Sequence, residues 1–349
     1  MTLLVKQAKD AARRWVLEEA SGTPGFSGAF FHGSTNWLSD DARLPATSDV
    51  DVMVVLDNSN PPLKPGKFMY EEVPLDVAYL SRDQLRSPEL VLSQYHLAGS
   101  FRATSVILDP SGQLTALQMA VSRDYAKQKW VYQRCQHARD KILRGFAFNE
   151  SDLFFDQVDT WLFPAGITTH LLLVAGLENP TVRRRYVAAR ELLAVYGRLD
   201  FYQYLLEMVG CAHINQASVE RHLASLSEAL DAAKTMIVTP FFFAADISDI
   251  ARAIAIDGSR ELIVRGDHRE AIFWMVATYS RCQRVFHSDA PVTVEEKFAQ
   301  GYHELLADLG IASLTDLQRR REQVRQALPV FWEVAEAIIA ANRAIEDES

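Results

Sequence analysis

The sequence is poor in the features that mark secreted, membrane-bound or nucleic-acid-binding proteins. Its 349 residues include only three cysteines, far apart and without paired metal-ligand spacing. They predict buried thiols in a reducing compartment. The net charge is −9, from 36 Lys and Arg against 45 Asp and Glu. This balance argues against a nucleic acid as the main substrate, because holding several phosphates requires a basic surface. A neutral or cationic molecule suits an acidic surface better.

Targeting and membrane signals are also scarce. The segment from Met1 to Ala20 carries charges throughout and lacks the apolar centre of a signal peptide. The longest apolar run, Trp161 to Leu177, contains Pro164, Gly166 and His170, and it is interpreted as a buried helix rather than a membrane span. The chain contains no internal repeat and no low-complexity tract. We therefore expect a cytoplasmic protein without a membrane partner.

What the sequence does contain is an ordinary globular composition, with 48% hydrophobic and 23% charged residues, in a chain long enough for two cores. Strand signals lie before Gly112 and nearly vanish after it. The pattern predicts an α+β fold: a small mixed β-sheet domain over residues 1–112, followed by an all-α helical domain over residues 113–349.

The expected elements follow from periodicity, capping residues and turns. The first domain should contain strands at Phe26–His32, Asp49–Leu56, Lys67–Glu72, Val73–Leu80 and Thr104–Leu108, with helices at Leu4–Glu19 and from Ser87 to about Leu97. The second should contain one long helix at Leu114–Leu143 and further helices at 152–163, 167–177, 181–196, 201–209, 218–237, 268–286, 294–309, 314–327 and 331–345. An Asp267–Glu270 capping box should start one of them.

The most informative stretch is Gly33 to Leu56. An apolar strand leads into Gly33-Ser34, and after a loop the chain reads Ser48-Asp49-Val50-Asp51-Val52. Residues two apart in a strand share a face and lie roughly 6 to 7 Å apart. The two carboxylates would then repel by about 2 to 3 kcal/mol at an effective dielectric constant of about 20. A hard divalent cation such as magnesium, which prefers oxygen ligands, would remove that cost.

Two more features belong with this pair. A glycine after a strand lets the backbone and the Ser34 hydroxyl approach a phosphate closely. Asp76 lies within the apolar segment Val73–Tyr79. A carboxylate in such a setting is costly unless it faces a cleft or a metal. Phosphate together with magnesium indicates a nucleotide.

Gly33-Ser34, the pair Asp49 and Asp51, and then Asp76 follow one another in the order of a known signature. They resemble the nucleotidyltransferase signature of the DNA polymerase beta superfamily. The resemblance covers about the first third of the chain and makes residues 1–112 a nucleotidyltransferase domain. It implies that Asp49, Asp51 and Asp76 are the catalytic carboxylates and ligands of Mg²⁺, with Asp76 either completing the metal site or accepting the acceptor's proton. Gly33, Ser34 and Ser48 are the residues implied to bind the nucleotide.

The reaction implied by the resemblance is in-line attack of an acceptor hydroxyl on the α-phosphorus of a nucleoside triphosphate. Magnesium stabilises the charge that develops, and pyrophosphate leaves. ATP is the expected co-substrate. The segment Thr35–Thr47 departs from the family pattern because it is long and contains Trp37 and Pro45. No nucleotide contact is predicted from it, including from Arg43.

A small nucleotidyltransferase unit followed by helices resembles the antibiotic nucleotidyltransferases that modify aminoglycosides or lincosamides. This likeness rests on architecture, length and acidity. It implies a helical acceptor-binding domain over residues 113–349 and a small, cationic acceptor. Candidate acceptor residues are the acidic group Asp246, Asp249, Asp257, Glu261 and Asp267, and the aromatic groups Phe241–Phe243 and Phe273-Trp274. Arg183–Arg185 is a candidate phosphate grip, with a solvated helix surface as the competing interpretation.

The sequence leaves two other functions open. The acceptor hydroxyl would belong to a protein in one of them, and in the other the chain would bind a nucleotide without turnover. His32, next to Gly33, is either an acid or base or a packing residue. The triphosphate's base and the presence of a homodimer are also open.

Overall fold

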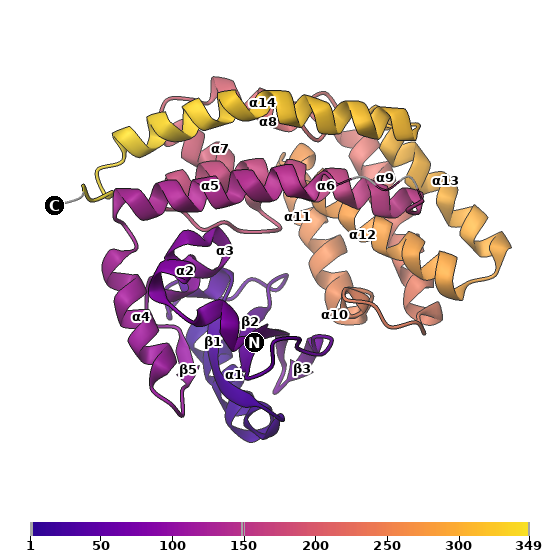
Figure 1. Cartoon of the computed structure of the whole chain (residues 1–349). Coiled ribbons are helices and arrows are strands. Elements are labelled where there is room, and N and C mark those ends of the chain that lie inside the picture. Colours follow the sequence, from indigo (N-terminus) through magenta and orange to yellow (C-terminus); the bar gives the residue numbers. More distant parts are fainter. Residues whose placement is uncertain (1–2, 148, 150, 348–349) are drawn as a thin grey trace. The chain divides into compact units, whose positions relative to one another are not determined.

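The computed structural model describes residues 3–147, 149 and 151–347 (Figure 1). The chain forms two compact units. The first runs to Arg134 and also includes Phe241–Ala245 and the segment from Ala344, while the second comprises Cys135–Pro240 and Asp246–Arg343. The first unit holds a five-stranded mixed sheet, and the second is helical, as the α+β prediction requires.

The sheet of the first unit has the strand order β3-β4-β2-β1-β5. Strands β2 and β4 run parallel, and the other neighbours are antiparallel. The strands are β1 (Phe26–His32), β2 (Val50–Leu56), β3 (Gly66–Tyr70), β4 (Val73–Ser81) and β5 (Val106–Leu108). The helices of this unit are α1 (Val5–Glu18), α2 (Pro88–Ser93), α3 (Tyr95–Ala98), α4 (Gln113–Asp124) and the start of α5 (Gln128–Gly145).

Each face of the sheet covers its own apolar core. Val50, Val52 and Val54 of β2 belong to the core that α1 closes. The alternate residues Met53 and Val55 belong to the other core, with side chains of α2 and α4. Because side chains alternate along a strand, Asp51 shares the face of Met53 and Val55.

The helix expected over Leu114–Leu143 is two helices, α4 and α5, with a short break between them. Leu114, Leu117 and Val121 of α4 pack into the second core beneath the sheet. This burial explains why the first unit extends beyond residue 112 to Arg134. The sequence showed helical periodicity in this region but not the core in which its apolar face is buried.

The hairpin of β3 and β4 turns at Glu71 and Glu72, which the sequence analysis placed at the end of a strand. Both residues have positive φ, 46° and 63°. A two-residue turn of this handedness matches the twist of paired strands. It sets the register, so that Tyr70 pairs with Val73 and Lys67 pairs with Asp76.

The second unit is an assembly of helices. They are the remainder of α5, α6 (Phe154–Ala175), α7 (Arg185–Val195), α8 (Asp200–Glu207), α9 (Gln216–Met236), α10 (Asp249–Arg252), α11 (Gly258–Val264), α12 (His268–Asp289), α13 (Val292–Asp308) and α14 (Leu314–Ala341). Helices α10 and α11, joined by a π-helical turn at Ala253–Asp257, were not predicted.

Two helix breaks predicted near prolines are wrong. Pro164 lies inside α6 and Pro329 inside α14, and both helices continue through them. An interior proline costs about 3 kcal/mol in a helix. Helix α6 compensates by burial, since nearly its whole length after Phe155 is buried, and it packs against α12 and α14.

The predicted Asp267–Glu270 capping box is also wrong, because Asp267 makes no side-chain cap hydrogen bond. Both carboxylates instead bind Arg190 at 2.7 Å, and Tyr202 donates a hydrogen bond to Glu270 at 2.6 Å. Other members of the acidic group likewise have basic partners within the second unit: Asp246 with Arg281, Asp249 with Lys234 and Asp257 with Arg260. Their charges are therefore largely compensated by the protein itself.

Helix α6 is long and apolar enough to cross a membrane, the one described helix to meet that test. However, 83% of its most apolar 18-residue stretch is buried inside the protein. This is the burial of a core helix, as predicted. All three cysteines are buried, which the sequence also predicted. Burial raises the pKa of Cys211 to about 12, so this thiol stays protonated at neutral pH.

Asp159 of α6 gives a testable stability effect in the second unit. Burial raises the pKa of its carboxyl to about 7, although Arg281 favours the charged form. Its Oδ1 has no hydrogen-bond partner among the described residues. Because the pKa is higher in the folded state, the carboxyl lowers the free energy of unfolding at pH values above its unfolded pKa. This loss of stability grows as the pH rises toward 7. We expect Asp159→Asn to stabilise the protein by about 2 to 4 kcal/mol at pH 8 and by almost nothing near pH 4.

Chemical denaturation of the Asp159→Asn variant and the unmodified chain at both pH values measures this difference. An equal stability difference at pH 4 and pH 8 would contradict the assignment.

Candidate active site

A row of polar side chains crosses four adjacent strands of the first unit. Asp51 of β2 pairs in register with Asp76 of β4 and with His32 of β1. Asp76 in turn pairs with Lys67 of β3. Residues directly opposite one another on neighbouring strands share a face and have Cβ atoms about 5 Å apart. The sheet therefore brings Lys67, Asp76, Asp51 and His32 together on one face.

Asp49 joins this row from the residue before β2. Its charge acts on Asp51, two positions further along, and Lys67 connects it to Asp76. Lys67 Nζ donates to Asp49 Oδ2 and, at 2.5 Å, to Asp76 Oδ2. The three carboxylates predicted from the sequence are thus neighbours, although a loop and the whole of β3 separate Asp51 from Asp76 along the chain.

The carboxylates differ in their electrostatic surroundings. Burial raises the pKa of Asp51 well above its usual value, and the like charges of Asp49 and Asp76 add to the rise. Burial also acts on Asp76, but Lys67 and Lys64 together lower the pKa of Asp76 below its usual value. Asp76 therefore stays ionised at neutral pH, whereas the negative charge of Asp51 is poorly compensated.

Gly33 fits closely beside Asp51. Its φ is +65°, a conformation that residues with a side chain rarely adopt. A Cβ atom built on Gly33 would lie 1.8 Å from Asp51 Oδ2. Both the backbone angle and the contact therefore require glycine. Ser34 follows at the start of the 3₁₀ turn η2 (Ser34–Trp37), where its side chain is half-buried.

His32 lies at the end of the row. Its Nδ1 is 2.6 Å from the hydroxyl of Ser100, which lies in the 3₁₀ turn η4 (Gly99–Phe101). Burial lowers the pKa of His32 to about 4, against the opposing effect of Asp76. The imidazole is therefore neutral at pH 7 and supplies no positive charge to the site. The bond to Ser100 fixes its ring beside the site, the packing position that strand alternation favours.

The long segment Thr35–Thr47 is anchored to the start of α1. Backbone amides of Val5 and Lys6 donate to the carbonyls of Ala42 and Asp40, each at 2.9 Å. Leu44 is buried in the core that α1 closes, and Arg43 beside it is exposed. The extra length therefore attaches the segment to the first unit.

Ser48 ends this loop immediately before the carboxylates. Its backbone amide donates to the carbonyl of Pro45 at 2.9 Å, which turns the chain into Asp49. The predicted nucleotide-binding role of Ser48 stays a prediction, and the structure gives this residue a local role in orienting the start of β2.

Three basic side chains near the site were not predicted from the sequence. Lys67 and Lys64 bind Asp76, with Lys64 Nζ at 3.4 Å from Asp76 Oδ1. Arg102 is exposed, and its guanidinium lies over the Trp37 ring with 3.7 Å to the ring centroid. The hairpin turn fixes the pairing of Lys67 with Asp76, but Glu71 and Glu72 lack the Asn, Asp or Gly residues that signal such a turn in a sequence. No sequence signal singled out Arg102, because its contact with Trp37 joins distant parts of the chain.

The oxygen atoms of Asp49, Asp51 and Asp76 show whether the site fits the magnesium ion that the resemblance implies. All its donors are carboxylate oxygens, the ligands that Mg²⁺ prefers. The poorly compensated charge of Asp51, beside Asp49, favours a cation there. Within the described ranges, however, no three His, Cys, Asp or Glu side chains are arranged to hold one metal ion. Lys67 lies between Asp49 and Asp76 instead. The residues therefore fit a hard cation at Asp49 and Asp51, with Asp76 held by lysines.

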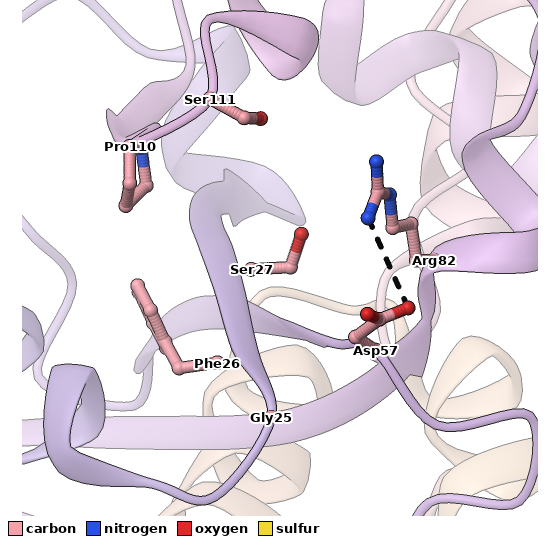
Figure 2. A pocket seen from close by; sticks show the side chains of 7 residues that line it. All are labelled: Gly25, Phe26, Ser27, Asp57, Arg82, Pro110 and Ser111. Carbon is pink, nitrogen blue, oxygen red and sulfur yellow. Dashed lines mark ion pairs between the residues drawn. The ribbon is translucent and has the colours of Figure 1, made fainter.

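A separate hollow lies where β1 begins and β2 and β4 end, at the opposite ends of these strands from the carboxylates (Figure 2). Its volume is about 310 Å³, and Arg82 and Asp57 lie next to each other on one side of it as an ion pair, with 3.8 Å between Nη1 and Oδ1. Arg82 also donates to Gln113 at 2.6 Å. The two charged groups compensate each other, so the hollow shows no preference for a charged ligand.

Comparison of the sequence with known proteins assigns the chain to no family. No protein-family model matches the chain, and no curated protein matches it. The likeness to nucleotidyltransferases therefore rests on the residues of the site.

Proposed function

We propose that the protein is a magnesium-dependent nucleotidyltransferase that moves a nucleoside monophosphate, AMP from ATP, onto a hydroxyl of a small cationic molecule. The observation that carries the proposal is the close set of Asp49, Asp51 and Asp76 beside Gly33. Three carboxylates in one partly buried cluster are costly for folding alone. Asp51 fills the space that the missing side chain of Gly33 leaves, and its poorly compensated charge supports a role of the cluster in binding a cation.

The phosphate side of the site follows from the segment after β1. Gly33 lets a phosphate oxygen approach its backbone, and Ser34 supplies a hydroxyl. Arg102 brings a guanidinium to the same segment, because it stacks on Trp37, three residues after Ser34. A planar guanidinium matches phosphate oxygens well. We assign the terminal phosphates of the triphosphate to Ser34 and Arg102.

The chemistry divides between the carboxylates. Asp49 and Asp51 would hold magnesium, which when bound stabilises the charge that develops on the phosphoryl oxygens and the leaving group. Asp76 is a weak proton acceptor because its lysine neighbours lower its pKa. Both oxygens of Asp76 bind lysines, so in place of the two roles expected of it, metal ligand or proton acceptor, we propose that Asp76 positions the lysines beside the metal site. The acceptor hydroxyl then loses its proton to another base or to solvent.

The acceptor class rests on charge. The net charge of −9 favours a cationic molecule, such as an aminoglycoside-like antibiotic. The acidic group Asp246–Asp267 gives little further support, since its members have basic partners of their own. A role in antibiotic resistance is the corresponding biological proposal.

The test uses the full chain with labelled ATP, magnesium and a panel of aminoglycosides and lincosamides. Acceptor-dependent release of pyrophosphate is the expected result. Asp49→Ala should reduce it at least about 10³-fold, since a metal ion contributes several kcal/mol to the transition state. Asp57→Ala is the matched control, because Asp57 follows the same strand at its other end and is 70% exposed. Equal activity of Asp49→Ala and Asp57→Ala would refute the proposal.

A second function is favoured by one contact. Lys67 already binds Asp49 and Asp76, which suits a protein that binds a nucleotide without turnover. Magnesium-dependent ATP binding without pyrophosphate release, for every small molecule and protein acceptor tried, would favour this alternative. Transfer to a protein hydroxyl would instead appear as an AMP adduct in a mass spectrum of that protein.

A further inference from the structure

The contact that stands out within the site is the insertion of Lys67 between two of the three carboxylates. Its side chain is only 8% exposed, and those of Asp49 and Asp76 are 16% exposed. Lys64 binds the other oxygen of Asp76 and is 12% exposed. These ion pairs are therefore largely shielded from solvent. Ion pairs that are exposed to solvent contribute little to stability, whereas breaking a buried pair is costly.

Both lysines are held in place by packing. Lys67 lies on β3 directly opposite Asp76, in a register that the tight turn at Glu71 and Glu72 sets. Lys64 Nζ lies 5.3 Å and 5.8 Å from the ring centroids of Phe242 and Phe243. Such cation–π contacts stabilise an ammonium group at a fixed position.

The segment that carries these rings belongs to the first unit although it is distant in sequence. It also contacts the start of β3, because a Cβ on Gly66 would lie 2.3 Å from the Ala245 side chain. This segment, Phe241–Ala245, includes the aromatic candidate Phe241–Phe243 and supports the lysines of the site.

The charges of this cluster limit how many cations it accepts. The three carboxylates carry three negative charges and the lysines two positive charges, so one negative charge remains. Two ammonium groups carry the charge of one divalent ion. A divalent ion placed between Asp49 and Asp76 would lie against the Lys67 ammonium and be repelled by its charge. Asp51 has no lysine ion pair among the described residues, so a divalent ion on the Asp51 side of Asp49 lies farther from Lys67 than one between Asp49 and Asp76 and is repelled less.

We infer that the site takes one divalent ion per nucleotide, at Asp49 and Asp51, and that Lys67, supported by Lys64, replaces a second ion between Asp49 and Asp76. This inference rests on the proposed function. Two-metal sites in phosphoryl transfer hold both reacting oxygens between two ions about 4 Å apart. Here Lys67 is a positioning residue, because its ammonium group is bound to Asp76 and supplies a positive charge at a fixed place.

Equilibrium dialysis of the full chain against Mn²⁺ and a non-hydrolysable ATP analogue tests the inference. The measured quantity is the number of retained Mn²⁺ ions per retained nucleotide. We expect one for the unmodified chain and two for Lys67→Met, which removes the charge and keeps a side chain of similar length. Lys67→Arg should retain a ratio of one. Lys6→Met, at an exposed position of α1, is the matched control and should also give one.

The outcomes separate this inference from the proposed function. Two ions per nucleotide on the unmodified chain would overturn the inference and leave the nucleotidyltransferase proposal standing. No metal-dependent retention of nucleotide would overturn both. The ratio on the unmodified chain decides the matter even if Lys67→Met fails to fold, which circular dichroism would show.

Discussion

Asp51→Asn is expected to abolish nucleotidyl transfer while raising the stability of the metal-free protein. Loss of a metal-binding carboxylate should lower the rate at least about 10³-fold, the scale of several kcal/mol of transition-state stabilisation. Burial and the like charges of Asp49 and Asp76 raise the pKa of Asp51, so its charged form is disfavoured in the folded state. Asparagine keeps the shape of the side chain and removes that charge.

The sign of the stability effect follows from linkage. A carboxyl whose folded pKa is raised destabilises the folded state above its unfolded pKa, and the penalty disappears as the group becomes protonated at low pH. We expect Asp51→Asn to be more stable by about 1 to 3 kcal/mol at pH 8 without divalent ions, and little different near pH 4. Urea unfolding in the presence of a chelator measures this difference.

Asp159→Asn is the matched control for Asp51→Asn. Asp159 also has a raised pKa but belongs to the helical unit rather than to the unit that holds the carboxylate cluster. It should share the stabilising sign and retain transfer activity. An Asp51→Asn variant that is less stable than the unmodified chain at pH 8 would show that the Asp51 charge is compensated in the folded protein.

Gly33→Ala is expected to have the second-largest effect, on both folding and activity. Gly33 has φ 65° and ψ −155°, a combination that is essentially restricted to glycine and costs alanine about 1 to 3 kcal/mol. The added Cβ would also lie 1.8 Å from Asp51 Oδ2, so that the carboxylate or the backbone must shift. We expect a total destabilisation of about 2 to 4 kcal/mol and a loss of Mg²⁺-dependent nucleotide binding. Denaturation measures the first effect and equilibrium dialysis the second.

Gly112→Ala gives the cost of a left-handed helical glycine with free space around it, φ 74° and ψ 0°. Gly112 has φ +74°, and a Cβ there would meet nothing within 4 Å. It should therefore cost only about 1 kcal/mol. Adding Asp51→Ala to Gly33→Ala should recover part of the lost stability, since the clash partner is gone and contacting residues are not additive. Equal destabilisation by Gly33→Ala and Gly112→Ala would mean that Asp51 does not lie against Gly33.

The local pattern predicted the parts of the site that lie close together in the chain. Alternation along one strand was enough to place Asp49 and Asp51 on one face, and the glycine that leaves β1 was expected to allow a close approach. The prediction of Asp76 used the cost of a carboxylate in an apolar strand. Its register with Asp51 then followed from the pairing of β2 with β4.

The sequence by itself determined the order of the elements, the α+β class and the acidic, cysteine-poor character of the chain, because composition, periodicity and turn residues act locally. The tertiary structure decided which strands are neighbours and which charges meet. Lys67 and Asp76 lie on different strands, and Phe242 is far from Lys64 along the chain, yet sheet pairing and packing bring them into contact. The sequence indicated three carboxylates that would bind metal ions. In the folded protein the same cluster also binds the ammonium groups of Lys64 and Lys67, since a buried charge is stable only beside its counter-charge.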